Sequence, residues 1–330
     1  MKNTKTYWRG RKCLITGGMG FGGSHLTEQL LKRGAHVYVL DQICPRNSYM
    51  VLTGLLDQVE YITGDIRDVG LLRIILDRFE IEMVFHLAAQ PIVPMSNTLP
   101  LETLSINAMG TYSVLDAIRT SQSCNSLVFS SSGAYYGTTT QDEPIPEDAP
   151  PIQASNIYAP SKVAGDIAVR CYSQIYNMKT SVCRFINTYG PGKTEFSTIV
   201  PRTIKTLIDG DPYDFGDRDD GTTVLDYMHV RDMALGYIAA AEHMDKYSGE
   251  AFNFGGSNPI SVADLVKLIS RIYDSKEREP IFHGPKKKTP IRKCLDTSKA
   301  HKLLGWQSRT PLSDGLKETI QWYQKYWDHM

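Results

Sequence analysis

The first half of the sequence alternates between two hydrophobic periods, and this alternation constrains the fold more than any other feature. Short runs that are apolar throughout predict buried strands, and the stretches between them have the spacing of amphipathic helices. Strands that are apolar on both faces are typical of parallel sheets covered by helices on both sides. We therefore predict an α/β fold with a Rossmann-type, doubly wound parallel sheet. The predicted strands are residues 12–16, 36–40, 59–62, 83–88, 127–130 and 180–186, and the predicted helices are residues 24–34, 69–79, 101–121 and 156–177.

The composition changes after Asn187. Gly, Pro and Asp become frequent, and helical patterns follow without regular strand partners. We expect residues 1–186 to form the Rossmann domain and residues 187–330 to form a smaller C-terminal substrate domain over the carboxyl edge of the sheet. The apolar run 251–255 predicts one more strand, so the segment 226–256 is expected to return to the first domain.

Charge and cysteine usage exclude several classes of protein. Lys plus Arg equals Asp plus Glu at 36 each, which argues against nucleic-acid or anionic membrane partners. The polar N-terminal stretch predicts no signal peptide, and no apolar run approaches the roughly 18–20 residues of a membrane helix. The six cysteines are scattered, with no CxxC pair and no clustered His, so we expect no disulfide framework and no metal site. These features predict a cytoplasmic protein.

A glycine-rich turn follows the first predicted strand. Gly17, Gly20 and Gly23 recur at three-residue intervals before a helix, and the second predicted strand runs into Asp41, 18 residues beyond Gly23. Glycine allows the backbone to approach a pyrophosphate, and the helix N-terminus offers free N–H groups to it. A carboxylate after the second strand accepts hydrogen bonds from a ribose 2′-hydroxyl and repels a 2′-phosphate. The pattern predicts NAD as the cofactor, although Arg46 leaves NADP as the alternative.

Other residues are assigned to the same dinucleotide site by their positions at strand ends. Asp65 and Ile66 follow the third predicted strand, where they could meet the adenine or form an ordinary polar turn. Small residues after the fourth strand are consistent with backbone packed against the dinucleotide. The full predicted cofactor set is Gly17, Gly20, Phe21, Gly22, Gly23, Asp41, Asp65, Ile66, Leu87, Ala88 and Ala89, with Tyr158 and Lys162.

The stretch SLVFSSSGAYYG indicates a strand that ends at hydroxyl residues. Open α/β sheets bind ligands at the carboxyl ends of their strands, so Ser132 is a candidate catalytic hydroxyl. Tyr158 and Lys162 are four residues apart and share one face of the helix predicted there. An ammonium group on that face is expected to lower the phenol pKa, so that Tyr158 can take a proton from a sugar hydroxyl as hydride leaves the same carbon.

These residues carry a family resemblance. Gly-Gly-x-Gly-Phe at 17–21, Ser132, Tyr158-x-x-x-Lys162 and RFINTYGPG at 184–192 resemble the extended short-chain dehydrogenase/reductases that act on nucleotide sugars. The likeness covers almost the whole chain. It implies a Rossmann domain carrying NAD, a nucleotide-sugar substrate, and Ser132, Tyr158 and Lys162 as the catalytic set. It also implies a homodimer formed through two helices per subunit, here residues 99–121 and 156–177.

Several segments are similar to CDP-glucose 4,6-dehydratases, but two positions depart from that pattern. The dehydratases follow the catalytic hydroxyl with Asp and then Glu or Lys, whereas this chain has Gly133 and Ala134, neither of which can exchange a proton. We therefore predict a nucleotide-sugar epimerase, most simply acting at C4. A 4,6-dehydratase with a relocated acid and base, a 4-keto-sugar reductase and a redox-sensing binding protein remain as alternatives.

The resemblance also implies a set of substrate contacts. Asn187 would meet the sugar or diphosphate, a helix that contains Val200 and Arg202 would lie beneath the nucleotide, and Phe215 would border the base. The family usually places Arg where this chain has Leu225, which removes one phosphate contact. Arg202, Lys205 and Arg292 are the candidate replacements.

Overall fold

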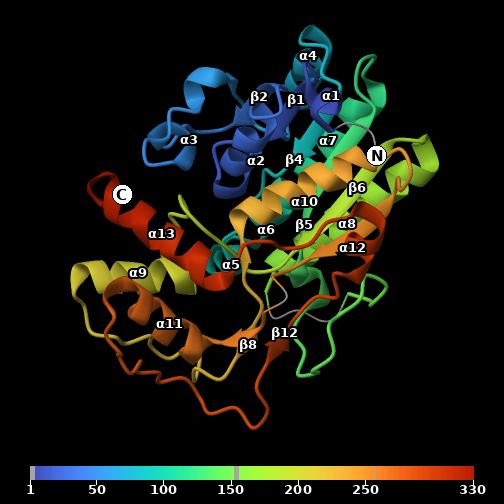
Figure 1. Cartoon of the computed structure of the whole chain (residues 1–330). Coiled ribbons are helices and arrows are strands. Elements are labelled where there is room, and N and C mark those ends of the chain that lie inside the picture. The colour runs from blue at the N-terminus through green and yellow to red at the C-terminus, as the bar shows by residue number, and fades with distance from the viewer. Residues whose placement is uncertain (1–3, 152–155, 257) are drawn as a thin grey trace.

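The computed structural model describes residues 4–151, 156–256 and 258–330, and a parallel sheet forms its centre (Figure 1). Seven strands lie in the order β10-β6-β5-β4-β1-β2-β3, and every pair of neighbours is parallel. This arrangement confirms the predicted Rossmann-type fold class. The strands are β1 (Lys12–Thr16), β2 (His36–Asp41), β3 (Glu60–Thr63), β4 (Met83–His86), β5 (Ser126–Ser132), β6 (Lys179–Phe185) and β10 (Glu250–Phe254).

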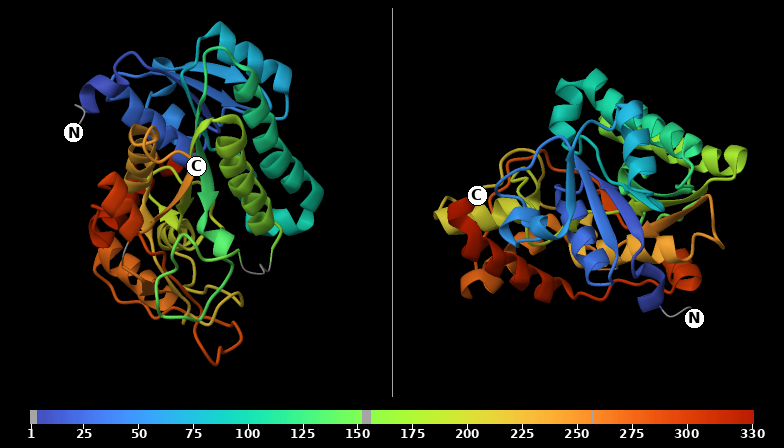
Figure 2. Two further views of the ribbon diagram at one scale, coloured as in Figure 1. Left: turned by 90° about the vertical axis from the view of Figure 1, so that its right-hand side faces the viewer. Right: turned by 90° about the horizontal axis from the view of Figure 1, so that it is seen from above.

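Helices cover both faces of this sheet, as the two views of Figure 2 show. On one face, α2 (Phe21–Leu31), α10 (Val230–Glu242), α12 (Ser298–Leu304) and the short α1 (Thr4–Trp8) contribute to one apolar core. On the other face, α4 (Val69–Arg78), α7 (Gly110–Thr120) and α8 (Tyr158–Tyr176) contribute to a second core. Within β1, Cys13 and Ile15 belong to the first core and Leu14 to the second. Burial on both sides explains why the strand is apolar at successive positions.

A smaller lobe lies beyond the carboxyl ends of the strands, at the lower left of Figure 1. Its own core joins α9 (Ile199–Asp209), α11 (Val262–Asp274) and α13 (Leu312–Tyr326). A three-stranded sheet in the order β11-β8-β12 lies beside these helices and consists of β8 (Val224–Leu225), β11 (Ile260–Ser261) and β12 (Arg292–Lys293). The pair β7 (Thr188–Tyr189) and β9 (Met228–His229) links the lobe to the main sheet, and η4 (Trp327–His329) follows α13.

The segment 226–256 lies largely against the main sheet. Within it, α10 packs on the face that carries α2, and β10 pairs with β6 at the sheet edge, with Glu250 opposite Ser181. The chain therefore passes from the large layer to the lobe and back, enters the lobe again, returns to the main layer with α12, and finishes in the lobe. The domain boundary at residue 187 stays a prediction.

The helix predicted over residues 101–121 is interrupted. It consists of α6 (Pro100–Leu104), a π-helical turn η2 (Ser105–Met109) and α7, and it is preceded by α5 (Val93–Thr98). Within this stretch, the Thr111 hydroxyl donates to the Asn107 carbonyl oxygen at 2.6 Å. Such a side-chain bond competes with the regular backbone pattern, so uniform amphipathic spacing did not reveal the turn. The remaining short elements are α3 (Tyr49–Leu52), η1 (Leu56–Gln58) and η3 (Gly133–Tyr136).

None of the helices in the described ranges combines the length and the apolar character that crossing a bilayer requires.

Candidate active site

The turn between β1 and α2 is built on close backbone approach. A Cβ atom on Gly17, whose φ is +72°, would lie 2.6 Å from the Ala88 backbone nitrogen. A Cβ on Gly23 would lie 2.3 Å from the Gly17 carbonyl oxygen. Contacts this short do not occur for real side chains, so both positions require glycine. The turn presents backbone at the N-terminus of α2, which is the geometry that fits a dinucleotide pyrophosphate.

The other residues of the turn have separable roles. Gly20 is the N-cap of α2, and its carbonyl oxygen accepts from the Ser24 amide at 3.0 Å. A Cβ on Gly22 would lie 2.5 Å from the Met233 methyl carbon, so this glycine allows α2 to pack against α10. Phe21 begins α2, and the Lys193 ammonium lies 5.6 Å from the centre of its ring.

Asp41 ends β2 beside this turn. Its carboxylate accepts a hydrogen bond from the Met19 amide at 3.1 Å and another from the Gln42 amide at 2.9 Å. Burial raises the pKa of Asp41, and the backbone N–H donors act in the opposite direction. The carboxylate is therefore fixed next to the glycine turn at residues 17–23, which we call the glycine cradle because it is predicted to hold the pyrophosphate. This is the position expected of a ribose-binding acid. Its contact with the cofactor stays a prediction.

Asp65 and Ile66 follow β3 at the same edge. The carboxylate of Asp65 is held by the Arg67 guanidinium at 2.6 Å and by the Gln42 side-chain amide at 2.8 Å. The Arg67 hydrogen bond lowers the pKa of Asp65. Ile66 is buried, and its side chain fills the space that a Cβ on Gly110 would enter. Leu87, Ala88 and Ala89 follow β4 and are half-buried along the same edge.

A matched pair of glycine replacements tests the cradle. We expect Gly17→Ala to weaken NAD binding at least about tenfold, because the methyl group would clash with the Ala88 backbone. Gly54→Ala is the control. Gly54 has a similar left-handed conformation, with a φ of +69°, so its replacement by alanine carries the same backbone cost of about 1–2 kcal/mol. Nothing lies within 4 Å of the added Cβ, so this variant causes no clash. NAD titration of both variants makes the comparison. Equal NAD affinity in the two variants would remove the cradle assignment.

The three predicted catalytic residues come together at the carboxyl end of β5. Ser132, the last residue of β5, lies beside the side chain of Tyr158, the first residue of α8, close enough to influence the pKa of the phenol. The Ser132 oxygen also accepts from the Ala134 amide at 3.0 Å. The backbone amide of Tyr158 donates to the Ser96 hydroxyl on α5 at 3.2 Å, which fixes the start of the helix. Lys162 is buried one helical turn further on.

The sequence predicted that the Lys162 ammonium lowers the pKa of Tyr158, and the electrostatics of the three residues differ from that prediction. Burial raises the pKa of Tyr158, while the Ser132 side chain beside it acts in the opposite direction. Burial lowers the pKa of Lys162 to about 8. The Lys162 ammonium donates to the Ser130 carbonyl oxygen at 2.9 Å and not to the phenol. A shared helix face therefore did not determine the hydrogen-bond partner of Lys162, because a long side chain can reach several acceptors.

A buried hydrogen-bond chain beneath the trio was not predicted. His86 joins two hydroxyls, with Nδ1 2.7 Å from Thr16 Oγ1 and Nε2 3.1 Å from Thr111 Oγ1. Because the Thr111 hydroxyl donates its single proton to the Asn107 carbonyl, it must accept from His86 Nε2–H. Nδ1 therefore accepts from the Thr16 hydroxyl, which in turn accepts from the Ala88 amide at 3.3 Å. One tautomer of His86 satisfies every bond.

The same chain continues to the catalytic helix. The Asn107 side-chain amide donates to the Ser161 hydroxyl at 2.9 Å, and Ser161 donates to the Tyr158 carbonyl oxygen at 2.7 Å. The bonds thus connect β1 and β4 to the first turn of α8. No short sequence motif contains these residues, which are up to 145 positions apart in the chain (161 − 16).

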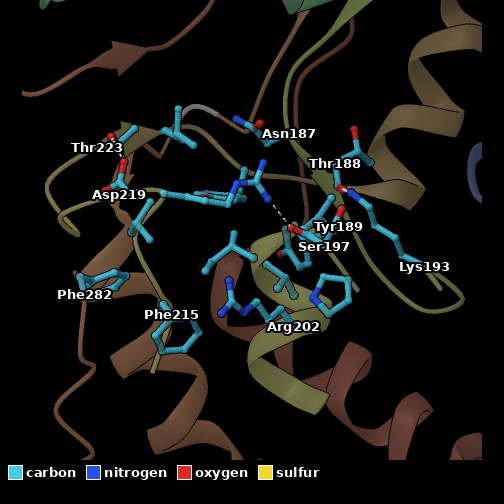
Figure 3. A pocket seen from close by; sticks show the side chains of 18 residues that line it. Asn187, Thr188, Tyr189, Lys193, Ser197, Arg202, Phe215, Asp219, Thr223 and Phe282 are labelled. Carbon is cyan, nitrogen blue, oxygen red and sulfur yellow. Dashed lines mark hydrogen bonds between the residues drawn. The ribbon is translucent and has the colours of Figure 1, made fainter. Parts of the chain in front are cut away.

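A cavity of about 270 Å³ lies in the lobe beyond the sheet (Figure 3). Asn187, Val200, Arg202 and Phe215, four of the five predicted substrate contacts, line it. The ring of Phe215 stacks on Phe282 with 5.4 Å between centroids, which offers an aromatic wall to a flat ligand. Phe282 was missed because it comes from an irregular loop with no periodic signal. Further lining residues are Thr188, Tyr189, Lys193, Ser197, Arg218, Asp219, Thr223, Leu225 and Tyr227.

Cationic side chains outnumber anionic ones in the cavity wall. The Arg202 guanidinium donates to the Asp214 carbonyl oxygen at 3.4 Å and lies 5.6 Å from the centre of the Phe215 ring. Arg218 donates to the Ser197 carbonyl oxygen at 3.4 Å. The lining carboxylate Asp219 is neutralised by Lys287. The cavity is therefore suited to an anion.

Two other candidate cations are placed elsewhere. Arg292 is half-exposed and forms an ion pair of 2.7 Å with Asp142, outside the cavity wall. Lys205 forms an ion pair with Asp209 on α9. Neither side chain is brought to the residues that line the cavity.

Comparison with known proteins identifies the family. Residues 14–319 match the sequence model of the GDP-mannose 4,6-dehydratase family. The chain belongs to this family. The predicted membership of the extended short-chain dehydrogenase/reductases that act on nucleotide sugars is thereby confirmed.

Other members of the family show what the fold supports. UDP-glucose 4-epimerase of Mycolicibacterium smegmatis is 30% identical over 95% of this chain and 98% of its own length. The structure of UDP-glucose 4-epimerase from Thermotoga maritima, solved with UDP-glucose, has a TM-score of 0.85 and 29% identity, covering 96% of this chain and 99% of that one. The dTDP-glucose 4,6-dehydratase of Streptomyces venezuelae, solved with NAD, has a TM-score of 0.84 and 25% identity over 95% and 97% of the two chains. The family thus contains both epimerases and dehydratases.

Two small residues follow Ser132. Gly133 and Ala134 form the start of η3, and neither carries an ionisable group. A Cβ on Gly133 would lie 3.3 Å from the Phe185 carbonyl oxygen and 3.5 Å from the Leu295 side chain. A carboxylate at position 133 would therefore enter a closely packed corner next to a backbone carbonyl.

Proposed function

We propose that this chain is an NAD-dependent nucleotide-sugar 4-epimerase. The observation that carries the proposal is the composition of the strand end: Ser132 lies beside Tyr158 there, and no acidic side chain directly follows the serine. Transient oxidation of a sugar alcohol needs one group to remove and return a proton, whereas elimination of water needs an additional acid and base. The names of the 4-epimerase relatives support the same reaction.

NAD is the cofactor, as predicted, and the glycine cradle and Asp41 are the residues that would hold it. When bound, NAD supplies the hydride acceptor and donor for reversible oxidation at the sugar carbon. As the phenolate, the Tyr158 side chain would take the proton of the C4 hydroxyl, and as the phenol it would later return that proton. Ser132 lies beside Tyr158 and would orient the reacting oxygen, and the buried Lys162 adds positive charge beside the site.

The test is product analysis with UDP-, GDP-, CDP- and dTDP-sugars labelled with oxygen-18 at C6. We expect a C4 epimer with its C6 label retained and no net consumption of NAD or NADH. A 4-keto-6-deoxy product without the label would show the dehydratase instead. Stoichiometric oxidation of NADH with a 4-keto sugar would show the reductase. Absence of a C4 epimer from all four substrate classes contradicts the proposal.

We also propose that the enzyme is a homodimer that packs through α7 and α8. These helices lie side by side on the outside of the sheet (Figure 2). Large apolar side chains are exposed on them and on the helices just before α7: Leu99, Leu101, Met109, Tyr112, Ile167, Ile175 and Tyr176. Leu101, the most exposed, is 81% accessible. An apolar surface that spans several helices is typical of a protein interface.

Sedimentation velocity tests the dimer. We expect the wild-type protein to sediment as a dimer and the variant Leu101→Glu, Ile167→Glu as a monomer that still binds NAD. A wild-type monomer at micromolar concentration would remove this proposal. The cytoplasmic location also stays a proposal, supported by six cysteines that are all unpaired.

A further inference from the structure

Lys293 carries a cationic group with no partner in the part of the chain that the structure describes. The side chain is partly buried, and none of the hydrogen bonds or ion pairs involves its ammonium. Nearby Lys287 differs, since it forms an ion pair with Asp219. Burial lowers the pKa of Lys293 to about 8, with no neighbouring carboxylate to counter it. A partly buried charge of this kind costs stability unless something balances it.

The register of the small sheet places Lys293 beside the cavity. β12 pairs with β8 in parallel, and Lys293 is directly opposite Leu225. Leu225 lines the cavity, as do Thr223 and Tyr227, the residues two positions before and after it. Residues opposite each other on neighbouring strands are about 4.8 Å apart and project to the same face. Lys293 is not itself a lining residue, but its side chain starts next to Leu225 on the same face of the small sheet.

The other end of the same segment meets the catalytic strand. Leu295, two residues beyond Lys293, lies 3.5 Å from the position of a Cβ on Gly133, the residue after Ser132. Extended backbone advances about 3.3 Å per residue, so Lys293 is within about 7 Å of Leu295 along the chain. Lys293 thus lies between Leu225 in the cavity wall and Leu295 beside Gly133, the residue after Ser132.

A second unpartnered group faces the same space. The Tyr227 hydroxyl is buried, with the residue only 6% exposed, and has no hydrogen-bond partner among the described residues. Tyr227 lines the cavity. A buried hydroxyl without a partner costs about 1–3 kcal/mol, so this site has one donor that awaits an acceptor. Anionic oxygens would satisfy both the hydroxyl and the ammonium.

We propose that Lys293 and Tyr227 bind the diphosphate of the nucleotide sugar, between the aromatic wall that receives the base and the catalytic end that receives the sugar. This inference rests on the proposed nucleotide-sugar function and names the residues that recognise its charged part. Arg202 and Arg218 border the same cavity with long hydrogen bonds only, so they are available for the same anion. A nucleotide sugar bound in this way would contact both the smaller lobe and the main sheet.

Calorimetric titration of the full-length protein with UDP, CDP, GDP and dTDP tests the proposal. The nucleoside diphosphate that binds the wild type most tightly is then compared with the free nucleoside that carries the same base. We expect Lys293→Met to weaken diphosphate binding about 10–100-fold, because a charge-assisted hydrogen bond is lost. We expect no change for the nucleoside or for NAD. Lys302→Met, which removes an exposed lysine on α12, is the matched control and should bind like the wild type.

A second variant separates charge from shape. Leu225→Arg combined with Lys293→Met returns a cation to the neighbouring strand position and should recover most of the diphosphate affinity. Two results overturn the proposal: unchanged diphosphate affinity in Lys293→Met, or an equal loss of affinity for the nucleoside. If the wild type binds none of the four diphosphates, the nucleotide-sugar function itself fails, and that outcome is visible before any variant is compared.

Discussion

Replacing Tyr158 by Phe is expected to lower the turnover number by about 10²–10⁴-fold, the usual contribution of a positioned acid–base group. The substitution removes only the hydroxyl that lies beside Ser132. The fold should survive, because the first turn of α8 is fixed through backbone atoms, including the bond from the Tyr158 amide to Ser96. NAD affinity should change little.

Tyr247→Phe is the matched control. This substitution also removes a hydroxyl group. Tyr247 lies just before β10, at the amino ends of the strands and opposite the candidate site. Steady-state rates with the identified sugar nucleotide, together with NAD titration, give the comparison. Near-normal turnover by Tyr158→Phe would assign the proton transfer to another group. The redox-sensing alternative would then regain support, because a sensor does not need this hydroxyl.

Replacing Arg184 by Met is expected to lower the free energy of unfolding by about 3–5 kcal/mol. Arg184 and Asp166 are both completely buried, and two guanidinium nitrogens each lie 2.8 Å from a carboxylate oxygen. A third nitrogen donates to the Tyr136 hydroxyl at 2.7 Å, and Ser131 donates to Asp166 at 2.7 Å. Removing the arginine would leave a buried carboxylate with one neutral donor.

Arg119→Met is the control for this prediction. Arg119 also forms an ion pair with an aspartate, Asp116, but both side chains are about one-third exposed. Its loss should therefore cost only about 0–1 kcal/mol. Denaturant unfolding of both variants measures the difference. The double variant Asp166→Leu, Arg184→Met should be more stable than Arg184→Met alone, since it leaves no buried charge. Similar losses for Arg119→Met and Arg184→Met would show that the buried pair has no special role.

Much of the main layer could be predicted because its determinants are local. The run from Lys12 to Thr16 is apolar at both alternating sets of positions, and this is the pattern that a strand between two cores requires. The glycines at 17 and 23 follow from a strand–turn–helix geometry that lies within a dozen residues. The π-helical turn at Ser105–Met109 was not predicted, because it accompanies side-chain bonds to groups that are distant in the sequence.

The candidate site also contains residues that local sequence patterns predict and residues that only the folded structure brings together. Ser132 and Asp41 stand at the ends of recognisable strands, so their placement at one sheet edge followed from the topology. Phe282 comes from an irregular segment and Lys293 from a two-residue strand. Only the folded arrangement brings Phe282 into the cavity wall and Lys293 opposite the lining residue Leu225. Arg292 shows the converse: its neighbour in the sequence projects from the other face of the strand, so a one-residue difference decides which cation is available to a ligand.

The chain of bonds through His86 holds a fixed number of protons. Each hydroxyl in it donates once, and a second proton on the ring would set two donors, His86 and Thr16, against each other. Burial lowers the pKa of His86 to about 3, against about 6.5 for an unfolded chain. The native state favours the neutral ring, so its contribution to stability is complete above about pH 6.5 and is lost as the pH falls toward 3. Acid would therefore loosen this enzyme from the layer beneath the helix that begins at Tyr158, where the same chain of bonds ends at the Tyr158 carbonyl oxygen.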